Sequence, residues 1–275
     1  MSNRPALRDQ RLRIMEGVLT WEGEIGNARV RQLFNLQPVQ ASRLLADFRA
    51  LMGSRIVEDG RAKVLRYAVP EEAGSLISLE EYVLHSAAAE GGNPSLIDAR
   101  ADLTDVQPII FATLRKAVIS KTGVKISYAS MANPRYAERT IFPHAIVHVG
   151  RRWHVRAWCA KRQGYRDFTL GRVRSIEAVP EHAPSDIGSD DGWETIVDLG
   201  LQAHRKLSVD QQQVVQDEYF GGTSERRLSV RACLVKYLIQ DLRVAINPEL
   251  DKPPEYQIEL KNLSEIKKWL FMDIQ

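Results

Sequence analysis

The feature that most restricts the fold of this chain is a pair of short amphipathic segments, residues 27–34 and 38–52, separated by a turn of three residues. Both segments carry apolar side chains at spacings of three and four, which is the period of one buried side of an α-helix. Pro38 suits the first helical position of the second segment, and Gly53 suits its end. Two short helices joined by a tight turn predict a helix-turn-helix.

The flanking segments extend this unit. Residues 4–20 place apolar side chains on one side of a further helix and arginines on the other, and Asn27 can cap the helix that follows. Residues 54–69 alternate apolar and polar side chains on either side of residues 58–60 (Glu-Asp-Gly), which is a strong hairpin signal. We therefore predict a winged helix-turn-helix over residues 1–70.

The outer side of the second helix is the predicted contact with DNA, because the second helix of this motif enters the major groove by its N-terminal end. Gln40 and Arg43 are the candidates for base readout, since Gln pairs with adenine and Arg with guanine through two hydrogen bonds each. An ordinary amphipathic surface helix carries the same residue types, so the hairpin that follows is what favours DNA. Its basic residues would lie near phosphates. The predicted DNA contacts are Gln37, Val39, Gln40, Ser42, Arg43, Arg61, Lys63 and Arg66.

The positive charge of the chain is concentrated in two segments. Residues 1–69 hold 12 Lys or Arg against 7 Asp or Glu, and residues 121–179 hold 12 against 3, although the whole chain has a net charge of only +3. Because neutralisation of phosphates supplies much of the affinity for nucleic acids, each basic segment indicates an anionic partner. The alternative is a solvated basic face with no partner.

Residues 71–120 differ in character and predict a helical linker. Two helical patterns, near 79–89 and 107–120, flank a Gly-Gly-Asn-Pro break at 91–94. The helix near 107–120 carries an apolar stripe, which could pack against another part of the chain or form a dimer contact. The sequence leaves these two alternatives open. The stripe of the second helix consists of Ile109, Ile110, Leu114 and Val118.

Residues 121–180 predict a small twisted β-sheet or partial barrel. Alternating runs at 124–131, 138–149, 152–160 and 166–178 are joined by turn residues. Aromatic and cationic side chains of these runs could line one surface, which suits a phosphate-bearing or nucleotide-like ligand through charge and stacking. The predicted ligand contacts are Tyr128, His144, His154, Arg156, Arg166, Phe168 and Arg172.

The last part of the chain predicts a separate module. An acidic segment rich in Ser, Gly and Asp, residues 180–192, precedes it. Residues 193–275 contain three expected strands and three expected helices, so we predict a small α+β module with either an intersubunit role or a plain accessory one. The fold class expected for the whole chain is multidomain α+β.

Two stretches of the basic sheet resemble the WYL domain. They are residues 152–159 (Arg-Trp-His-Val-Arg-Ala-Trp-Cys) and 166–173 (Arg-Asp-Phe-Thr-Leu-Gly-Arg-Val), and the name-giving Trp-Tyr-Leu of that family falls on residues 153–155. The order of winged helix, helical linker, WYL domain and C-terminal WCX extension resembles the WYL repressors of bacterial phage-defence systems, the CapW and BrxR group. The resemblance covers nearly the full chain.

This resemblance implies an Sm-like WYL domain over residues 121–180 and a WCX-like dimerisation domain over residues 193–275. It implies a homodimer that binds an inverted-repeat operator in double-stranded DNA and represses a nearby phage-defence operon. A ligand at the WYL domain, such as a nucleic acid or a nucleotide, would relieve repression through the seven contacts named above. This chain departs from the family pattern at His154, Val155 and Gly171, which bears on the choice of ligand.

The sequence disfavours an enzyme. The basic sheet segment holds only three carboxylates and no paired nucleophile and base, and Gly221-Gly222 lacks the lysine and spacing of a phosphate-binding loop. We therefore expect no catalytic residues, no metal and no cofactor. Since there is no long apolar run and no apolar leader, we expect a cytoplasmic protein without membrane contact, in which Cys159 and Cys233 are buried thiols.

Two other functions stay open at the level of the sequence. The chain could be a transcription activator or a nucleic-acid-binding accessory factor that does not repress. It could also be a small-molecule-binding protein whose N-terminal domain makes only protein contacts, in which case it would not retard DNA at low salt.

Overall fold

The structure is a computed structural model that describes residues 4–70, 74, 76–87 and 103–270. The chain divides into two compact units, residues 1–101 and 102–275, which we describe separately. The Gly-Gly-Asn-Pro break predicted at 91–94 lies outside the described residues.

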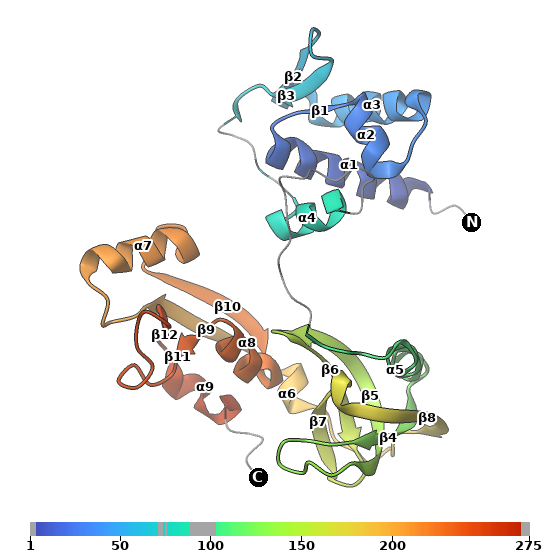
Figure 1. Cartoon of the computed structure of the whole chain (residues 1–275), viewed down its shortest axis with the longest axis vertical. Coiled ribbons are helices and arrows are strands. Elements are labelled where there is room, and N and C mark those ends of the chain that lie inside the picture. Colours follow the sequence, from blue (N-terminus) through green and yellow to red (C-terminus); the bar gives the residue numbers. More distant parts are fainter. Residues whose placement is uncertain (1–3, 71–73, 75, 88–102, 271–275) are drawn as a thin grey trace. The chain divides into compact units, whose positions relative to one another are not determined.

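The first unit is a winged helix, as the sequence predicts. Its helices pack around a core that includes Met15, Val30 and Phe48, all fully buried, and β2 and β3 project from them as a hairpin (Figure 1). The strands form a three-stranded sheet in the order β1-β3-β2. The elements are α1 (Arg4–Glu22), β1 (Ile25–Gly26), α2 (Asn27–Phe34), α3 (Pro38–Met52), β2 (Ile56–Asp59), β3 (Val64–Tyr67) and α4 (Leu79–Ala87).

The start of α2 differs from the sequence prediction. Gly26, and not Asn27, is the N-cap, and Asn27 donates hydrogen bonds to the Pro38 carbonyl (3.1 Å) and the Ser42 hydroxyl (2.9 Å) of α3. The side chain predicted to cap one helix therefore joins it to the next and helps to set the angle of the helix-turn-helix. Gly26 also pairs with Val64 of the hairpin, where an added Cβ would lie 2.9 Å from the Lys63 carbonyl, so only glycine lets the two segments approach.

Helix α4 contributes to the core of the first unit. Tyr82 is buried in that core together with Ile77, which precedes the helix. The Tyr82 hydroxyl donates to Glu22 at 3.0 Å, and Arg29 pairs with the same carboxylate. A helix that the sequence assigns to a linker thus packs against the winged helix.

The second unit begins with a bent, antiparallel five-stranded sheet, strand order β7-β6-β5-β4-β8, with α5 lying beside it (Figure 1). The predicted stripe of α5 is correct in part, because Ile110 and Leu114 are buried with Ala117 against the sheet, whereas Ile109 is 64% exposed. The helix therefore packs within the chain. The elements are α5 (Pro108–Ser120), β4 (Thr122–Tyr128), β5 (Ala137–Val149), β6 (Arg152–Cys159), β7 (Gly164–Thr169) and β8 (Val173–His182).

The run predicted as one strand at 166–178 is two strands. A 3-10 turn, Leu170–Arg172, separates β7 from β8, and β8 crosses to pair with β4. Leu170 is fully buried in the sheet core, so the turn is held by apolar packing. The spacing of three between Leu170 and Val173 breaks the period of two at this turn, and the prediction of one strand overlooked that break.

The C-terminal part is an α+β module, as predicted. Its sheet has the strand order β10-β9-β12-β11, and its core includes Leu199, Val235 and Ile266. No described helix is long and apolar enough to cross a membrane. The elements are α6 (Asp191–Glu194), β9 (Ile196–Ala203), α7 (Val209–Phe220), β10 (Glu225–Arg231), α8 (Val235–Asp241), β11 (Val244–Ala245), β12 (Ile258–Leu260) and α9 (Leu263–Leu270).

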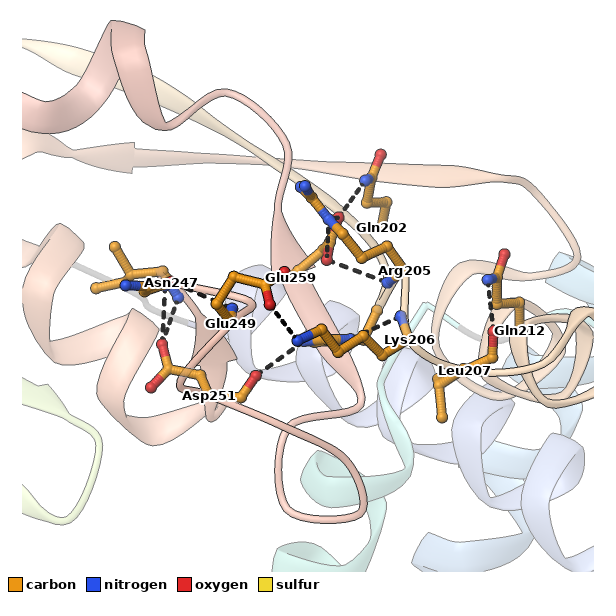
Figure 2. A network of polar contacts seen from close by, with 11 residues as sticks. Gln202, Arg205, Lys206, Leu207, Gln212, Asn247, Glu249, Asp251 and Glu259 are labelled. Atoms are coloured by element: carbon orange, nitrogen blue, oxygen red, sulfur yellow. Dashed lines mark hydrogen bonds and ion pairs between the residues drawn. The ribbon is translucent and has the colours of Figure 1, made fainter.

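A polar network holds the segment between β11 and β12 against the end of β9 (Figure 2). Glu259 is fully buried and accepts hydrogen bonds from the Gln202 amide (2.6 Å) and from the Arg205 main chain (3.1 Å) and guanidinium (3.0 Å). Lys206 pairs with Glu249 at 2.6 Å. Because a buried carboxylate is costly unless it is paired and hydrogen-bonded, we assign this network a structural role.

Candidate functional site

The first candidate site is the N-terminal end of α3, where the sequence places base readout. Gln37 is the N-cap of the helix, and its main-chain N–H donates to the Gln40 side-chain oxygen at 3.1 Å. Both side chains are exposed. The Gln40 side-chain oxygen thus already accepts one hydrogen bond at the start of the helix, and it has one lone pair left for a bidentate contact with adenine, which needs both ends of the amide.

Arg43 lies one turn further along the exposed side of α3. Among the described residues, none forms an ion pair or hydrogen bond with its side chain, so the guanidinium is available to a base. Val39 is 63% exposed beside it, while Ser42 is exposed but accepts from Asn27. Of the predicted readout residues, Arg43 has the geometry best suited to the role.

The wing consists of β2, β3 and the loop 60–63, which is longer than the hairpin signal suggests, since Asp59 pairs with Val64. The Asp59 carboxylate accepts from the main-chain N–H groups of Arg61 (3.0 Å) and Ala62 (2.9 Å), and these bonds, with an ion pair to Arg66, hold its pKa below the usual range. Arg61 and Lys63 extend from this loop and are exposed.

The three predicted phosphate contacts of the wing are not equivalent. Arg66 forms ion pairs with Glu24 (2.7 Å) and Asp59 (2.6 Å), whereas no described residue pairs with Lys63. Lys63→Ala is expected to weaken binding to all DNA sequences alike and to reduce the slope of log affinity against log salt by about 1. Arg66→Ala is expected to change the slope less. Titration of each variant with labelled duplex over a range of salt measures this, and equal slopes would refute the distinction.

The second candidate site is a cavity of about 570 Å³ on the five-stranded sheet. Tyr128 and Phe168 are nearly buried there, with ring centroids 5.0 Å apart in an edge-to-face contact. His154 also lines the cavity and is 3% exposed. Five of the seven predicted ligand contacts are therefore brought together, namely Tyr128, His154, Arg166, Phe168 and Arg172.

The cavity contains residues that the sequence prediction missed. Arg139, Arg152 and Arg162 line it with the two predicted arginines, and the one acidic side chain among its lining residues is Asp167. Strand alternation could have indicated Arg152, which shares a side of β6 with His154. Tyr237 reaches the cavity from α8 of the C-terminal module, which no local pattern could indicate.

The other two predicted ligand contacts, His144 and Arg156, lie outside this cavity. Arg156 is buried and binds Asp190 through two hydrogen bonds of 2.7 Å, and it also contacts Asp167 at 3.2 Å. His144 contacts the same Asp190 carboxylate at 3.0 Å. Burial acts against both charges, but the mutual hydrogen bonds and attraction raise the pKa of Arg156 and lower that of Asp190.

Asp190 connects the five-stranded sheet to the C-terminal module through this network. It caps α6 by accepting from the Trp193 N–H, and the network extends to Tyr237, whose hydroxyl donates to Asp167 at 3.1 Å. The acidic segment predicted as a linker thus ends in a buried carboxylate that binds the sheet to the C-terminal module. We therefore assign Arg156 and His144 a structural role in the connection between the sheet and the C-terminal module.

The two cysteines are free thiols in the structure. Cys159 is buried in the sheet core, whereas Cys233, predicted to be buried as well, is only half-buried. Burial raises the pKa of Cys233 to about 11, which keeps it protonated at neutral pH. Within the described ranges, no three His, Cys, Asp or Glu side chains are grouped so as to hold a metal ion.

Known families match both parts of the second unit. Residues 109–178 match the WYL domain, and residues 196–266 match the C-terminal dimerization domain of the BrxR transcriptional regulator. Behind the winged helix, the chain thus carries a WYL domain and a domain of the BrxR C-terminal dimerization type, which is an arrangement that defines the class of WYL-domain transcriptional regulators. The family predicted from the residues of the sheet is confirmed.

Within that class, the chain is similar over nearly its whole length to proteins described as the DNA-binding transcriptional repressor CapW. The Pseudomonas aeruginosa protein is 27% identical over 272 residues, which cover 94% of this chain and 91% of the relative. The Stenotrophomonas maltophilia protein is 26% identical over 280 residues, covering 97% and 93%. Among solved structures, Proteasome accessory factor B/C of Arthrobacter aurescens is 15% identical, with 96% of this chain and 45% of that chain covered and a TM-score of 0.29.

Proposed function

We propose that this chain is a homodimeric, sequence-specific DNA-binding repressor that is relieved by an anionic ligand at its WYL domain. In this proposal residues 1–70 bind DNA, residues 121–180 hold the ligand and residues 193–275 dimerise, with 71–120 connecting them. The operator is an inverted repeat near a phage-defence operon, and the protein acts in the cytoplasm without catalysis. The DNA contacts are those predicted from the sequence, with Arg43 as the principal base contact.

The observation that carries this proposal is the winged helix, in which neither Arg43 on the exposed side of α3 nor Lys63 in the wing has an ion-pair partner within the described part of the chain. A guanidinium is suited to guanine and an ammonium to phosphate. The similarity to repressors named CapW, extending over 94% of the chain, supports repression as the outcome of binding. The match of residues 196–266 to a dimerization domain supports a two-fold symmetric complex.

The cationic cavity of about 570 Å³ supports the ligand half of the proposal. Its arginines provide planar, multidentate donors for phosphate, and the aromatic rings of Tyr128 and Phe168 line the same cavity. A nucleotide or a single-stranded nucleic acid has both a phosphate and a flat base. Such a ligand changes operator affinity only if it binds the DNA-bound and DNA-free states differently.

Selection of bound sequences from random duplexes tests the DNA half. We expect an inverted repeat whose half-sites are separated by one helical turn or a multiple of it, because a two-fold symmetric dimer presents two α3 helices to one side of the duplex. Sedimentation of the complex gives its stoichiometry. A selected site without internal symmetry, or one bound by a single chain, would contradict the dimeric repressor.

Footprinting and ligand titration test the remaining steps. Binding over the promoter of its own operon favours repression, whereas binding upstream of the promoter favours the alternative, an activator. For the ligand, nucleotides and short single-stranded nucleic acids are added to the operator complex, and release of the operator is the expected result. If none of them alters operator binding, the cavity is not a nucleic-acid switch.

A further inference from the structure

Helix α2 of the winged helix is short and poorly capped. It has eight residues, its N-cap Gly26 makes no side-chain hydrogen bond, and its first turn has no acidic residue. Val30 is fully buried, whereas Leu33 and Phe34 are only partly buried. Because so short a helix is marginal by itself, its contacts with neighbouring elements decide where it lies.

Arg29, in the first turn of α2, provides such contacts to both α1 and α4. Its guanidinium donates to the two carboxylate oxygens of Glu22 (3.0 Å each) and to the Ser86 hydroxyl (3.2 Å). The side chains of Arg29 and Glu22 are 19% and 23% exposed, and Ser86 is buried. The helix dipole opposes a cation at the start of a helix, so Arg29 does not stabilise α2 from within. Its partners indicate that it fixes the place where α2 begins.

Helix α4 lies beside α1 and holds these partners in place (Figure 1). Tyr82 is buried in the core of the first unit, and its hydroxyl donates to Glu22 at 3.0 Å. The indole N–H of Trp21 in α1 donates to the carbonyl of Ile77, which precedes α4, at 3.3 Å. Helix α4 is therefore attached to α1 and to the core, and Ser86 in its last turn extends this attachment to α2.

The start of α2 is in turn bonded to α3. Asn27, two residues before Arg29, donates to the Pro38 carbonyl (3.1 Å) and to the Ser42 hydroxyl (2.9 Å). Arg43 follows Ser42 directly along α3. Because a specific contact requires placement to within about 0.5 Å, a shift at the start of α2 changes which base edge Arg43 can reach.

We infer that Arg29 and Ser86 are positioning residues for operator recognition, and that α4 is part of the DNA-binding unit although it lies outside residues 1–70. Hydrogen bonds connect Ser86 to Arg29 and, across the first turn of α2, Asn27 to α3, so the place of α4 sets the place of Arg43. Both residues act through α3 and make no contact of their own with DNA. This inference rests on the proposed reading of DNA by α3.

The experiment measures the affinity of the full chain for the operator selected from random duplexes and for a random duplex, at one salt concentration. We expect Ser86→Ala to reduce the ratio of the two affinities about fivefold, the equivalent of one hydrogen bond. Arg29→Lys should reduce it about tenfold, because an ammonium does not replace a guanidinium that binds two partners. Affinity for the random duplex should not change in either variant.

Ser78→Ala is the matched control. The Ser78 hydroxyl accepts from the main-chain N–H of Glu81 at 3.1 Å at the start of α4. The same substitution there destabilises the same helix but leaves the bond from Ser86 to Arg29 in place, so the ratio should stay at the wild-type value. Thermal unfolding shows that each variant is folded. If Arg29→Lys does not fold, Ser86→Ala decides the question, since it removes a single hydroxyl.

A double-mutant cycle tests whether the contacts act in series. Asn27→Ala breaks the same connection at α3, so adding Ser86→Ala to it should reduce the ratio little further. The inference is overturned if the two losses multiply, if Ser86→Ala leaves the ratio unchanged, or if it weakens binding to both duplexes equally, which is the result of a purely structural role. A wild-type chain that prefers no duplex contradicts the proposed function as well, so the two failures are distinguishable.

Discussion

Replacing Asp190 by alanine should lower the free energy of unfolding of the second unit by about 3–5 kcal/mol, because it leaves the Arg156 guanidinium buried without its main partner. The two side chains are only 8% and 6% exposed, and two hydrogen bonds of 2.7 Å join them. Denaturant unfolding followed by tryptophan fluorescence measures the loss. Asp191→Ala is the matched control, since Asp191 is the exposed next residue and should cost about half a kcal/mol or less.

The same ion pair makes the second unit sensitive to acid. The folded-state pKa of Asp190 is depressed, so its contribution is fully present above the unfolded pKa of about 3.9 and is lost as the pH falls through the folded pKa. The difference in stability between wild type and Asp190→Ala should therefore be constant near neutral pH and decrease in strong acid. A difference below about 1 kcal/mol at neutral pH would show that Asp167 alone satisfies Arg156.

Replacing Arg43 by alanine should weaken binding to the selected operator by about 1–3 kcal/mol, or roughly 5- to 150-fold, and relax sequence preference at one position of each half-site. The physical reason is the loss of a bidentate contact with guanine, for which Arg43 is exposed and unpaired among the described residues. Competition binding with operator and random duplexes at one fixed salt concentration measures both quantities.

Arg43→Lys provides the control for charge. It retains the positive charge but not the planar fork, so it should keep most of the affinity for random DNA and still lose operator preference. Equal losses on operator and random duplexes for Arg43→Ala would instead place Arg43 against a phosphate. Gln40 would then be the remaining candidate for base readout, although its oxygen already accepts from the Gln37 N–H.

Much of the fold could be predicted from the sequence because helices and strands are decided by short-range patterns. Ala41, Leu44, Leu45 and Phe48 of α3 follow the three-and-four spacing of one side of a helix, and all four are buried in the structure. The alternation along β6 likewise predicts which side of the strand is apolar. The interruption between β7 and β8 was missed, although the spacing of three between Leu170 and Val173 breaks the alternation at the turn.

The ligand site was only partly predictable for a different reason. Alternation places His154 and Arg156 on the same side of β6, but one faces a cavity and the other binds a carboxylate. That carboxylate, Asp190, is 34 residues further along the chain, in a segment whose composition is typical of an exposed linker. Pairing between distant charges depends on which segments meet in space, and no periodic pattern encodes this.

The same limit applies to Arg66 and Asn27 in the winged helix. The sequence marks Arg66 as a basic wing residue and Asn27 as a helix cap, yet the first is held by Glu24 and Asp59 and the second joins α2 to α3. The sequence by itself determined most of the helices and strands, the buried side of α3 and the two basic segments, because these follow from local spacing and composition. Tertiary structure alone decided which polar side chains are paired and which remain free for a ligand or DNA, because that choice is made by neighbours brought together only in the folded chain.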